Sequence, residues 1–341
     1  MQKRWQKLIF SALLCGGLII PQLSQANTSQ RQDVKSFIDR IANEHGFKRD
    51  DLKQMFDQIE IQPAIIDAMN RPYESKPWFQ YRPIFVTQAR IDEGVKFLQE
   101  NHQTLKQAEQ KYGVPAEIIT AILGVETRYG RYRGKYRVVD ALATLGFDYP
   151  RRSKFFLKEL EAFLLLSREE NFDPLTITSS YAGAMGKPQF MPSSYRMYAV
   201  DFDGDGVRDL LDNSADAIGS IANYLSRHGW LRDQPIAVKT KTTRQAPQKM
   251  GKLKKPSKSV QHWLDKGYKP IEATAQQLKA DLIVLENKQG PEYWLGLQNF
   301  YSITRYNHSE LYAMAVFQLS QGIKQQHQTG QSQVQAELRN K

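Results

Sequence analysis

The chain has 341 residues, of which 41% are hydrophobic and 24% charged, and its formal net charge is +11. This balance excludes a disordered tail, a collagen and a polytopic membrane protein. Because single hydrophobic cores stop growing beyond roughly 250–300 residues, the length predicts two or three packed domains.

The first 26 residues have the pattern of a secretory signal peptide. Three cations precede a 13-residue apolar run from Leu8 to Ile20, and small residues before Asn27 offer a cleavage site. The run is shorter than the roughly 20 residues of a membrane span, which disfavours the alternative of a transmembrane anchor. We therefore expect export to a bacterial periplasm and a mature chain that starts at Asn27, with 44 basic and 36 acidic side chains and a net charge of +8.

Cys15 is the only cysteine and lies within the predicted signal peptide. The mature chain would then contain no disulfide and be stabilised by apolar burial. The alternative is that Cys15 is the acylated first residue of a lipoprotein with an outer-membrane anchor. Because Leu13 and Leu14 stand where small residues normally precede a lipidated cysteine, we favour the form without the anchor.

Helical patterns dominate the segments that follow the signal peptide. Between residues 34 and 105, apolar side chains recur every three or four residues. Prolines and aromatic residues between Arg71 and Pro83 interrupt this pattern, which predicts an ordered connection over the surface of the next domain. Residues 111–232 alternate further helical runs with glycine-rich turns and contain nearly all the candidate functional residues.

The last third of the chain predicts a small sheet and a final helix. Short β-branched or aromatic runs at residues 236–238, 282–285, 293–295 and 300–303 predict strands. Residues 239–258 contain eight Lys or Arg and no acid, which predicts an exposed loop, or alternatively a contact with anionic cell-wall polymers or lipid headgroups. Helix is predicted from Ser309 to about Ile323, followed by a polar, glutamine-rich tail that we expect to fray.

The run from Gly113 to Glu126 predicts a helix with one acid on its apolar face. Pro115 suits the first helical position, and apolar residues recur at 118, 119, 122 and 125. Glu126 falls on this stripe near the C-terminal end, where desolvation and the helix dipole should raise the pKa of its carboxyl. A proton donor near neutral pH needs this property. The alternative is a structural Glu paired with Arg128, Arg131 or another cation.

Residues 149–152 and 179–192 have a composition that suits a sugar-binding groove. Cations follow a turn in the first segment, and small residues in the second let a backbone approach a ligand closely. Ser180 and Gln189 can hydrogen-bond a sugar, and the flat rings that are dense nearby offer apolar faces on which sugar rings pack. Each residue taken alone fits a place in the core better than a place in a binding site.

Residues 201–212 have the pattern of a calcium-binding loop. Acids stand at positions 1, 3, 5, 9 and 12 of twelve, and a glycine stands at position 6. Hard oxygen ligands suit calcium rather than zinc, and acids so close together would repel one another without a cation. The metal would order the loop without entering the chemistry. The alternative is an Asp/Gly-rich turn without metal. The candidate ligands are Asp201, Asp203, Asp205, the carbonyl of Val207, and Asp212.

Taken together, these segments resemble the lytic murein transglycosylase B family of the lysozyme-like superfamily. The similarity runs from about residue 78 to 232 and resumes at 305–309 (RYNHS). Its most specific parts are residues 124–130 (GVETRYG), 140–145 (DALATL), 149–152 (YPRR) and 189–195 (QFMPSSY). The sequence departs from the family pattern at two places. Members named as membrane-bound carry a lipidation cysteine, and Cys15 does not have the usual residues before it. Lys187-Pro188 stands beside Gln189, so the resemblance does not define the shape of that loop.

The resemblance implies an α+β, mainly α fold. We expect a helical domain from residues 27–100 and 304–341, a lysozyme-like catalytic core with the calcium loop from residues 101–232, and a small β domain with the basic loop from residues 233–303. It further implies glycan contacts and a possible closing calcium ligand at Asp216. The implied glycan contacts are Tyr81, Arg151, Arg152, Ser180, Gln189, Phe190, Tyr224, Tyr306, Asn307 and Tyr312.

The resemblance also makes Glu126 the single catalytic carboxylate of a lytic transglycosylase. By analogy, Glu126 protonates the β-1,4 bridge oxygen between N-acetylmuramic acid and N-acetylglucosamine. The carboxylate then removes a proton from the C6 hydroxyl, which closes a 1,6-anhydro ring. We expect no cofactor for catalysis, peptidoglycan glycan strands as the partner, no nucleic acid, and a monomer. The alternatives are a hydrolytic muramidase, which would use a second carboxylate, and a non-catalytic peptidoglycan-binding protein.

Overall fold

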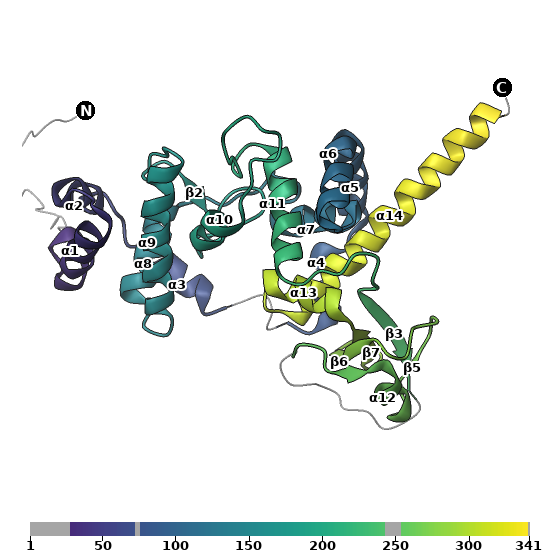
Figure 1. Ribbon diagram of the computed structural model, residues 1–341. Helices are drawn as coiled ribbons and strands as arrows, with labels where there is room; N and C mark the ends of the chain where they lie inside the picture. Colours follow the sequence, from purple (N-terminus) through teal and green to yellow (C-terminus); the bar gives the residue numbers. More distant parts are fainter. Residues whose placement is uncertain (1–27, 72–75, 243–253, 340–341) are drawn as a thin grey trace, which may run out of the picture. The chain divides into compact units, whose positions relative to one another are not determined.

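The structure is a computed structural model that describes residues 28–71, 76–242 and 254–339 (Figure 1). The chain divides into two compact units, of which the first ends at Gln58 and the second begins at Ile59. The predicted signal peptide, Cys15 and residues 243–253 of the basic stretch lie outside the described residues. Among the helices of the described ranges, none is both long enough and apolar enough to cross a membrane.

The first unit consists of a short 3-10 helix, η1 (Thr28–Gln30), and two α-helices, α1 (Gln32–His45) and α2 (Arg49–Asp57). The predicted apolar stripe of α1 is buried, and the Phe37 ring lies 5.8 Å from the Phe56 ring of α2. Gly46 ends α1 at φ 68°, a left-handed conformation that glycine adopts without a Cβ clash. The helical pattern predicted for this segment is confirmed.

The second unit is mainly helical, as predicted. Its helices are α3 (Pro63–Met69), α4 (Trp78–Phe85), α5 (Gln88–Glu100), α6 (His102–Tyr112), α7 (Ala116–Thr127), α8 (Val138–Asp148), α9 (Ser153–Glu169), α10 (Pro192–Tyr198), α11 (Ser214–Arg227), α12 (Val260–Asp265), α13 (Gln298–Tyr306) and α14 (Glu310–Arg339).

Helix α7 lies inside this unit, where it packs against α5, α6, α11 and α14. Every residue from Ile118 to Val125 is buried, as expected for a helix that is apolar all round. Gly124 lies under the Tyr129 ring, where a Cβ atom would come within 2.6 Å of the tyrosine hydroxyl. After the helix ends, Arg128 and Tyr129 adopt φ values of 50° and 62°, which turn the chain sharply away from Glu126.

Polar contacts of buried motif residues connect the neighbouring helices. Asp140 in α8 accepts a hydrogen bond from the backbone N–H of Glu60 at 3.0 Å and pairs with Arg137 at 2.6 Å. Ser193 in α10 donates its hydroxyl to the buried Glu159 of α9 at 2.7 Å. Two of the motifs recognised in the sequence, residues 140–145 and 189–195, therefore connect α8 to the segment before α3 and α10 to α9.

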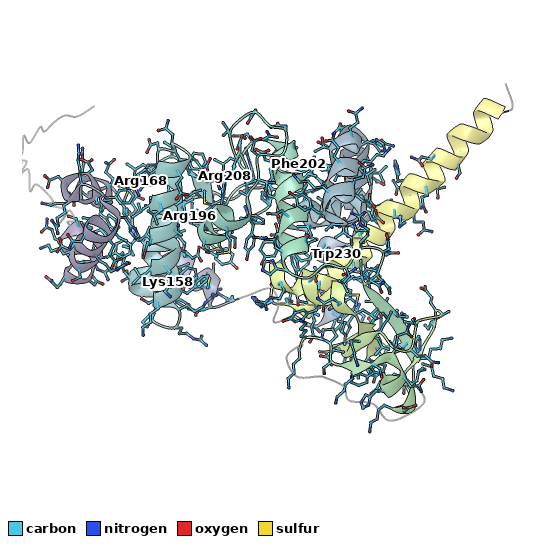
Figure 2. The ribbon with its side chains drawn as sticks, in the orientation of Figure 1. Lys158, Arg168, Arg196, Phe202, Arg208 and Trp230 are labelled. Carbon is cyan, nitrogen blue, oxygen red and sulfur yellow. The ribbon has the colours of Figure 1, made fainter. Side chains whose placement is uncertain are left out.

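Three further contacts of this helical core come from Arg196, Arg208 and Trp230, whose side chains are labelled in Figure 2. Arg196 of α10 pairs with Glu169 at 2.7 Å, and Arg208 pairs with Glu170, so two cations meet the acidic end of α9. Trp230, just beyond α11, donates its indole N–H to the carbonyl of Gly113 at 2.9 Å. That bond places the start of the α7 segment against the end of α11.

The strands form two antiparallel sheets. A two-stranded sheet joins β1 (Tyr136–Arg137) and β2 (Thr178–Ser179). A five-stranded sheet has the order β4-β6-β7-β3-β5, and α12 covers part of its core, which includes Val238, Leu282 and Leu295. The strands predicted at 236–238, 282–285 and 293–295 are confirmed. The sheet consists of β3 (Ala237–Lys241), β4 (Lys258–Ser259), β5 (Lys269–Pro270), β6 (Lys279–Leu285) and β7 (Glu292–Gly296).

Three local predictions were wrong. The run at 300–303 belongs to helix α13, since Phe300 and Ile303 are buried at the three-residue spacing of one helix face. The tail does not fray after Ile323, because α14 continues to Arg339, and polar contacts such as that of Lys324 with Glu117 at 2.8 Å support its extension. The segment before Pro83 is not only a connection, because α4 includes that proline and buries Trp78.

Candidate active site

Glu126 lies in the last turn of α7, where a tyrosine of α14 binds its carboxylate. The Tyr312 hydroxyl donates a hydrogen bond to Oε1 of Glu126 at 2.6 Å. Tyr312 is buried and Glu126 is half-buried. Burial raises the pKa of Tyr312 well above its ordinary value, and the charge of Glu126 raises it further. Tyr312 therefore remains a protonated donor toward Glu126.

An aromatic cluster extends from Tyr312 away from α14. The Tyr306 ring of α13 stacks on Tyr312 with centroids 6.4 Å apart and an interplanar angle of 6°. Phe190 lies 5.6 Å from Tyr306 and 5.5 Å from Tyr224 of α11, and the two tyrosine rings lie 5.0 Å apart. The structure thus brings four predicted glycan contacts together, and burial and the charge of Glu126 both raise the pKa of Tyr306.

The hydroxyls of this cluster bind backbone carbonyls. Tyr306 donates to the carbonyl of Pro188 at 2.5 Å, and Tyr224 donates to the carbonyl of Arg305 at 2.5 Å. Burial raises the pKa of Tyr224 to about 12, so it too stays protonated. Because Tyr306 and Tyr224 are each fixed by ring contacts and by the hydroxyl, this part of the cluster is preorganised.

Tyr81, another predicted glycan contact, reaches the cluster from α4. It is buried, its ring lies 5.0 Å from Phe85, and its proximity contributes to the raised pKa of Tyr312. Helices α4 and α14 pack together, so a residue far away in the sequence lies near Glu126. The sequence pattern alone gives no signal for this contact.

Arg151 and Arg152 are exposed at the start of α9. The Arg152 guanidinium lies 4.2 Å from the centroid of the Phe155 ring, a cation–π contact that orients it. Burial lowers the pKa of His308, and the nearby charges of Arg305 and Arg152 lower it further. The sequence indicated His308 only as part of the 305–309 segment, and the structure brings it close enough to Arg152 for that charge to lower its pKa.

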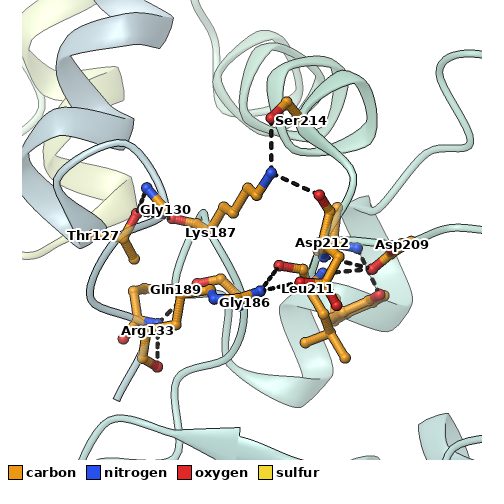
Figure 3. A network of polar contacts seen from close by, with 12 residues as sticks. Thr127, Gly130, Arg133, Gly186, Lys187, Gln189, Asp209, Leu211, Asp212 and Ser214 are labelled. Carbon is orange, nitrogen blue, oxygen red and sulfur yellow. Dashed lines mark hydrogen bonds and ion pairs between the residues drawn. The ribbon is translucent and has the colours of Figure 1, made fainter. Parts of the chain in front are cut away.

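Ser180 and Gln189 shape their own loop. The Ser180 hydroxyl accepts a hydrogen bond from the backbone N–H of Ala184 at 3.2 Å. Gln189 has φ 53°, and its amide donates to the carbonyls of Gly186 at 2.9 Å and Arg133 at 3.3 Å (Figure 3). Asn307 is half-buried next to Tyr306. In this arrangement the loop presents Phe190 and the Pro188 carbonyl to the aromatic cluster.

Lys187 connects the end of α7 to the acidic loop (Figure 3). Its ammonium donates to the carbonyl of Asp212 and to the hydroxyl of Ser214, both at 2.7 Å. Its own carbonyl accepts a hydrogen bond at 2.9 Å from the hydroxyl of Thr127, the residue after Glu126. Burial lowers the pKa of Lys187. The sequence alone did not show how Lys187 affects the shape of its loop. In the structure, Lys187 links the end of α7 to Asp212 and Ser214.

The loop at 201–212 has the donor chemistry that a calcium ion requires. Asp201, Asp203 and Asp205 each offer a carboxylate oxygen, and these oxygens all lie within 4.8 Å of one another. Gly206 adopts φ 92°, the conformation needed for the sharp turn at position 6. Since three hard oxygen donors converge from one short loop, these residues fit a calcium ion better than a soft metal.

The two candidates for closing this loop differ in their surroundings. Asp216 is buried at the start of α11, and its two oxygens accept hydrogen bonds at 2.7 Å from the backbone N–H groups of Phe202 and Asp209. Burial raises its pKa, and the charges of Asp203 and Asp201 raise it further. Asp212 is exposed and pairs with Arg133 at 2.5 Å. Asp216 therefore spans the loop, while Asp212 faces a cation.

The arginines that the sequence offered as partners for Glu126 bind another acid. Arg128 binds Glu93 of α5 through two hydrogen bonds, at 2.6 and 2.8 Å, and Arg131 pairs with the same carboxylate at 3.3 Å. The hydrogen bonds from Arg128 lower the pKa of Glu93, and the charge of Arg128 lowers it further. These ion pairs hold the turn after α7 against α5.

Comparison with known proteins gives a consistent set of relatives. Residues 29–321 match the family described as the transglycosylase SLT domain. The chain is 45% identical over 301 residues to the membrane-bound lytic murein transglycosylase B of Escherichia coli K12, a similarity that covers 85% of this chain and 82% of that protein.

Two solved structures show the same architecture. The structure of the catenated lytic transglycosylase SltB1 from Pseudomonas aeruginosa has a TM-score of 0.82 and 45% identity, over 87% of this chain and 98% of that one. The structure of the Escherichia coli lytic transglycosylase SLT35 in complex with calcium has a TM-score of 0.82 and 44% identity, over 88% of this chain and 95% of that one.

Proposed function

Because this chain belongs to the transglycosylase SLT family and is a lytic murein transglycosylase acting on peptidoglycan, we propose that Glu126 is its single catalytic acid and base. The observation that carries the proposal is the 2.6 Å hydrogen bond from the buried Tyr312 hydroxyl to Oε1 of Glu126. This bond orients a half-buried carboxyl at the end of an enclosed helix, beside an aromatic surface suited to sugar rings.

In the first step, protonated Glu126 donates its proton to the β-1,4 bridge oxygen between N-acetylmuramic acid and N-acetylglucosamine. The bond between the anomeric carbon and this oxygen breaks, and the N-acetylglucosamine part leaves with a free 4-hydroxyl. The muramic 2-acetamido group stabilises the positive charge that develops on the anomeric carbon. The Tyr312 hydroxyl stabilises the carboxylate that forms, because its hydrogen bond is stronger to the charged acceptor.

In the second step, the Glu126 carboxylate removes the proton from the C6 hydroxyl of the muramic residue. The C6 oxygen then bonds to the anomeric carbon, which closes the 1,6-anhydro ring and consumes no water. Glu126 ends the cycle protonated again. One carboxyl that is first acid and then base is therefore sufficient, whereas hydrolysing glycosidases use two.

The aromatic cluster supplies the glycan surface in this proposal. Tyr306 stacks on Tyr312 beside Glu126 and packs against Phe190, and Arg152 contributes a cation at the edge near His308. Ser180, Gln189 and Asn307 would add hydrogen-bonding groups from the adjoining loops. The proposed glycan contacts are Tyr81, Arg151, Arg152, Ser180, Gln189, Phe190, Tyr224, Tyr306, Asn307 and Tyr312.

We also propose that the loop at 201–212 binds calcium with a structural role. A relative of this chain, SLT35, has been solved in complex with calcium. The converging oxygens of Asp201, Asp203 and Asp205 support a site here, with the Val207 carbonyl as a further ligand. The metal would order the loop next to Lys187 and supply no catalytic group. Asp216, which spans the loop, and Asp212 remain the candidates for its closing ligand.

Export to the periplasm, by cleavage before Asn27, is proposed from the sequence of the first 26 residues. The net charge of +8 after cleavage suits contact with anionic envelope surfaces. N-terminal sequencing of the envelope protein should give a chain that starts at Asn27. A lipid-modified chain that starts at Cys15 would show that the signal belongs to a lipoprotein.

The test of the proposed function is Glu126→Gln, which keeps the shape of the side chain and removes the transferable proton. Its matched control is Glu117→Gln, the same change at the other end of α7, where the carboxylate pairs with Lys324. We expect Glu126→Gln to fold normally and to lose nearly all clearing of purified sacculi, while Glu117→Gln keeps it. Equal clearing by folded Glu126→Gln and the wild type would refute the role of Glu126.

A further inference from the structure

A hollow of about 600 Å³, distinct from the aromatic cluster at Glu126, lies where α4, the five-stranded sheet and α14 meet. Helices α4 and α14 pack together beside the strands (Figure 1). The lining combines flat rings with charged groups: Trp78, Phe79 and Arg82 from α4, and Lys239, Glu292 and Trp294 from the sheet. Lys288, in the loop between β6 and β7, completes one side.

Specific contacts fix the walls of this hollow. The backbone N–H of Phe79 donates to the carbonyl of Glu286 at 3.2 Å, which joins α4 to the loop after β6. Arg82 donates to the side-chain carbonyl of Gln318 in α14 at 2.6 Å. The Trp294 ring packs edge-on against Phe317 of α14 with centroids 6.1 Å apart. The hollow is therefore formed before any ligand arrives.

The charge in the hollow is positive on balance. Glu292 is neutralised by Lys239 at 3.3 Å, and Asn287 also donates to it at 2.5 Å. Lys288 lies 5.9 Å from the centroid of the Phe79 ring, and in the described part of the chain neither it nor Arg82 forms an ion pair with a carboxylate. A ligand that complements these walls carries anionic groups on a chain with small apolar parts.

The hollow shares two helices with the proposed catalytic site. Arg82 follows Tyr81 in α4, and Gln318 lies six residues after Tyr312 in α14, a rise of about 9 Å along the helix axis. A peptidoglycan strand carries, on its muramic residues, peptide stems with free carboxylates. A stem extending from a strand bound at Glu126 is long enough to reach a site one or two helical turns away.

We propose that this hollow is an accessory subsite that binds the carboxylate-bearing peptide stem of a peptidoglycan strand. The inference rests on the proposed function, because it takes the glycan part of the same strand to lie at Glu126. Arg82 and Lys288 bind stem carboxylates, and the rings of Phe79 and Trp294 cover its short aliphatic side chains. The subsite contributes to substrate binding and takes no part in the chemical step.

The experiment compares wild type with Lys288→Glu, and uses Lys266→Glu as the matched control. Both lysines are exposed, so each variant should fold, and Lys266 lies outside the lining of the hollow. Binding of a free acidic stem tetrapeptide is measured by titration calorimetry. Cleavage is measured on glycan strands with their stems and on strands from which an amidase has removed them.

We expect the tetrapeptide to bind the wild type and Lys266→Glu, and to bind Lys288→Glu about tenfold more weakly, since each tenfold change reflects about 1.4 kcal/mol. On strands with stems, Lys288→Glu should raise KM and leave kcat unchanged, the signature of lost binding that is equal in ground and transition states. On stripped strands the three proteins should not differ.

The proposal is overturned if the wild type binds no tetrapeptide, or if Lys288→Glu and wild type have equal KM on strands with stems. It is also overturned if a neutral N-acetylglucosamine oligomer binds in the hollow more tightly than the tetrapeptide. The tetrapeptide titration needs no turnover, so its result stands even if the assignment of Glu126 fails. Conversely, a wild-type protein that binds no tetrapeptide but still forms anhydro products would refute only the subsite.

Discussion

Tyr312→Phe removes one oxygen atom from the proposed catalytic site and leaves the ring in place. In the wild type, that oxygen donates a 2.6 Å hydrogen bond to Glu126 from a buried position. The bond becomes stronger when Glu126 is ionised, which is its state after it has protonated the bridge oxygen. Tyr312→Phe should therefore slow the chemical step more than it weakens substrate binding.

The size of the effect follows from the type of bond. A hydrogen bond to a charged group contributes about 1.5–3 kcal/mol, which corresponds to about a tenfold to hundredfold decrease in kcat. KM should change little, because the aromatic faces that contact the sugar remain. The donated hydrogen bond also favours the ionised carboxylate, so its loss should move the high-pH limb of the rate profile to higher pH.

The assay is release of soluble muropeptides from sacculi between about pH 4 and 9, with the melting temperature measured in parallel. Tyr268→Phe is the matched control, because Tyr268 lies in the separate core of the sheet. The reasoning is refuted if Tyr312→Phe keeps the wild-type kcat and pH profile, or if Tyr268→Phe loses as much activity.

Calcium should raise the melting temperature of the wild type, and Asp201→Ala should abolish that rise while leaving some activity in the cold; calorimetry without calcium binding would exclude the site. Arg152→Ala should lower kcat/KM by about tenfold and barely change the melting temperature, since the side chain is exposed and lies over the rings of Phe155 and Phe156; a large loss of stability with normal activity would contradict this. Lys187→Met should destabilise the fold by about 1–3 kcal/mol, because it removes two half-buried hydrogen bonds of 2.7 Å; an unchanged denaturant midpoint would disprove the connecting role. Burial lowers the pKa of His228 and His308 below 6.5, so the unfolded chain binds protons first and stability should fall as the pH drops below about 6.5; their contribution would be disproved if replacing both with Gln left the slope of stability against pH unchanged.

The helix that carries Glu126 was predictable because its pattern is local. The apolar spacing and Pro115 predict the start of α7 to within one residue of Ala116, where the helix begins in the structure. Three strands of the sheet were predictable for the same reason. The prediction of a strand at 300–303 was wrong because a four-residue apolar run fits both the two-residue repeat of a strand and the 3.6-residue repeat of a helix. In the structure, Phe300 and Ile303 are both buried on one face of a helix.

The surroundings of Glu126 were not predictable from spacing, because they depend on contacts between distant segments. Tyr312 follows Glu126 by 186 residues, and no local periodicity indicates that their side chains meet. Resemblance to a family could name both residues but not the atoms that touch. The connecting role of Lys187 was hidden for a similar reason, since its partners Asp212 and Ser214 lie in another segment.

Identification of the products tests the central claim most directly. Sacculi digested by the wild type and by Glu126→Gln are analysed by mass spectrometry of the released muropeptides. We expect the wild type to release muropeptides with 1,6-anhydromuramic ends, lighter by one water than reducing-end products, and Glu126→Gln to release almost none. Products that carry only free reducing ends would contradict the mechanism in which Glu126 acts alone as acid and then base.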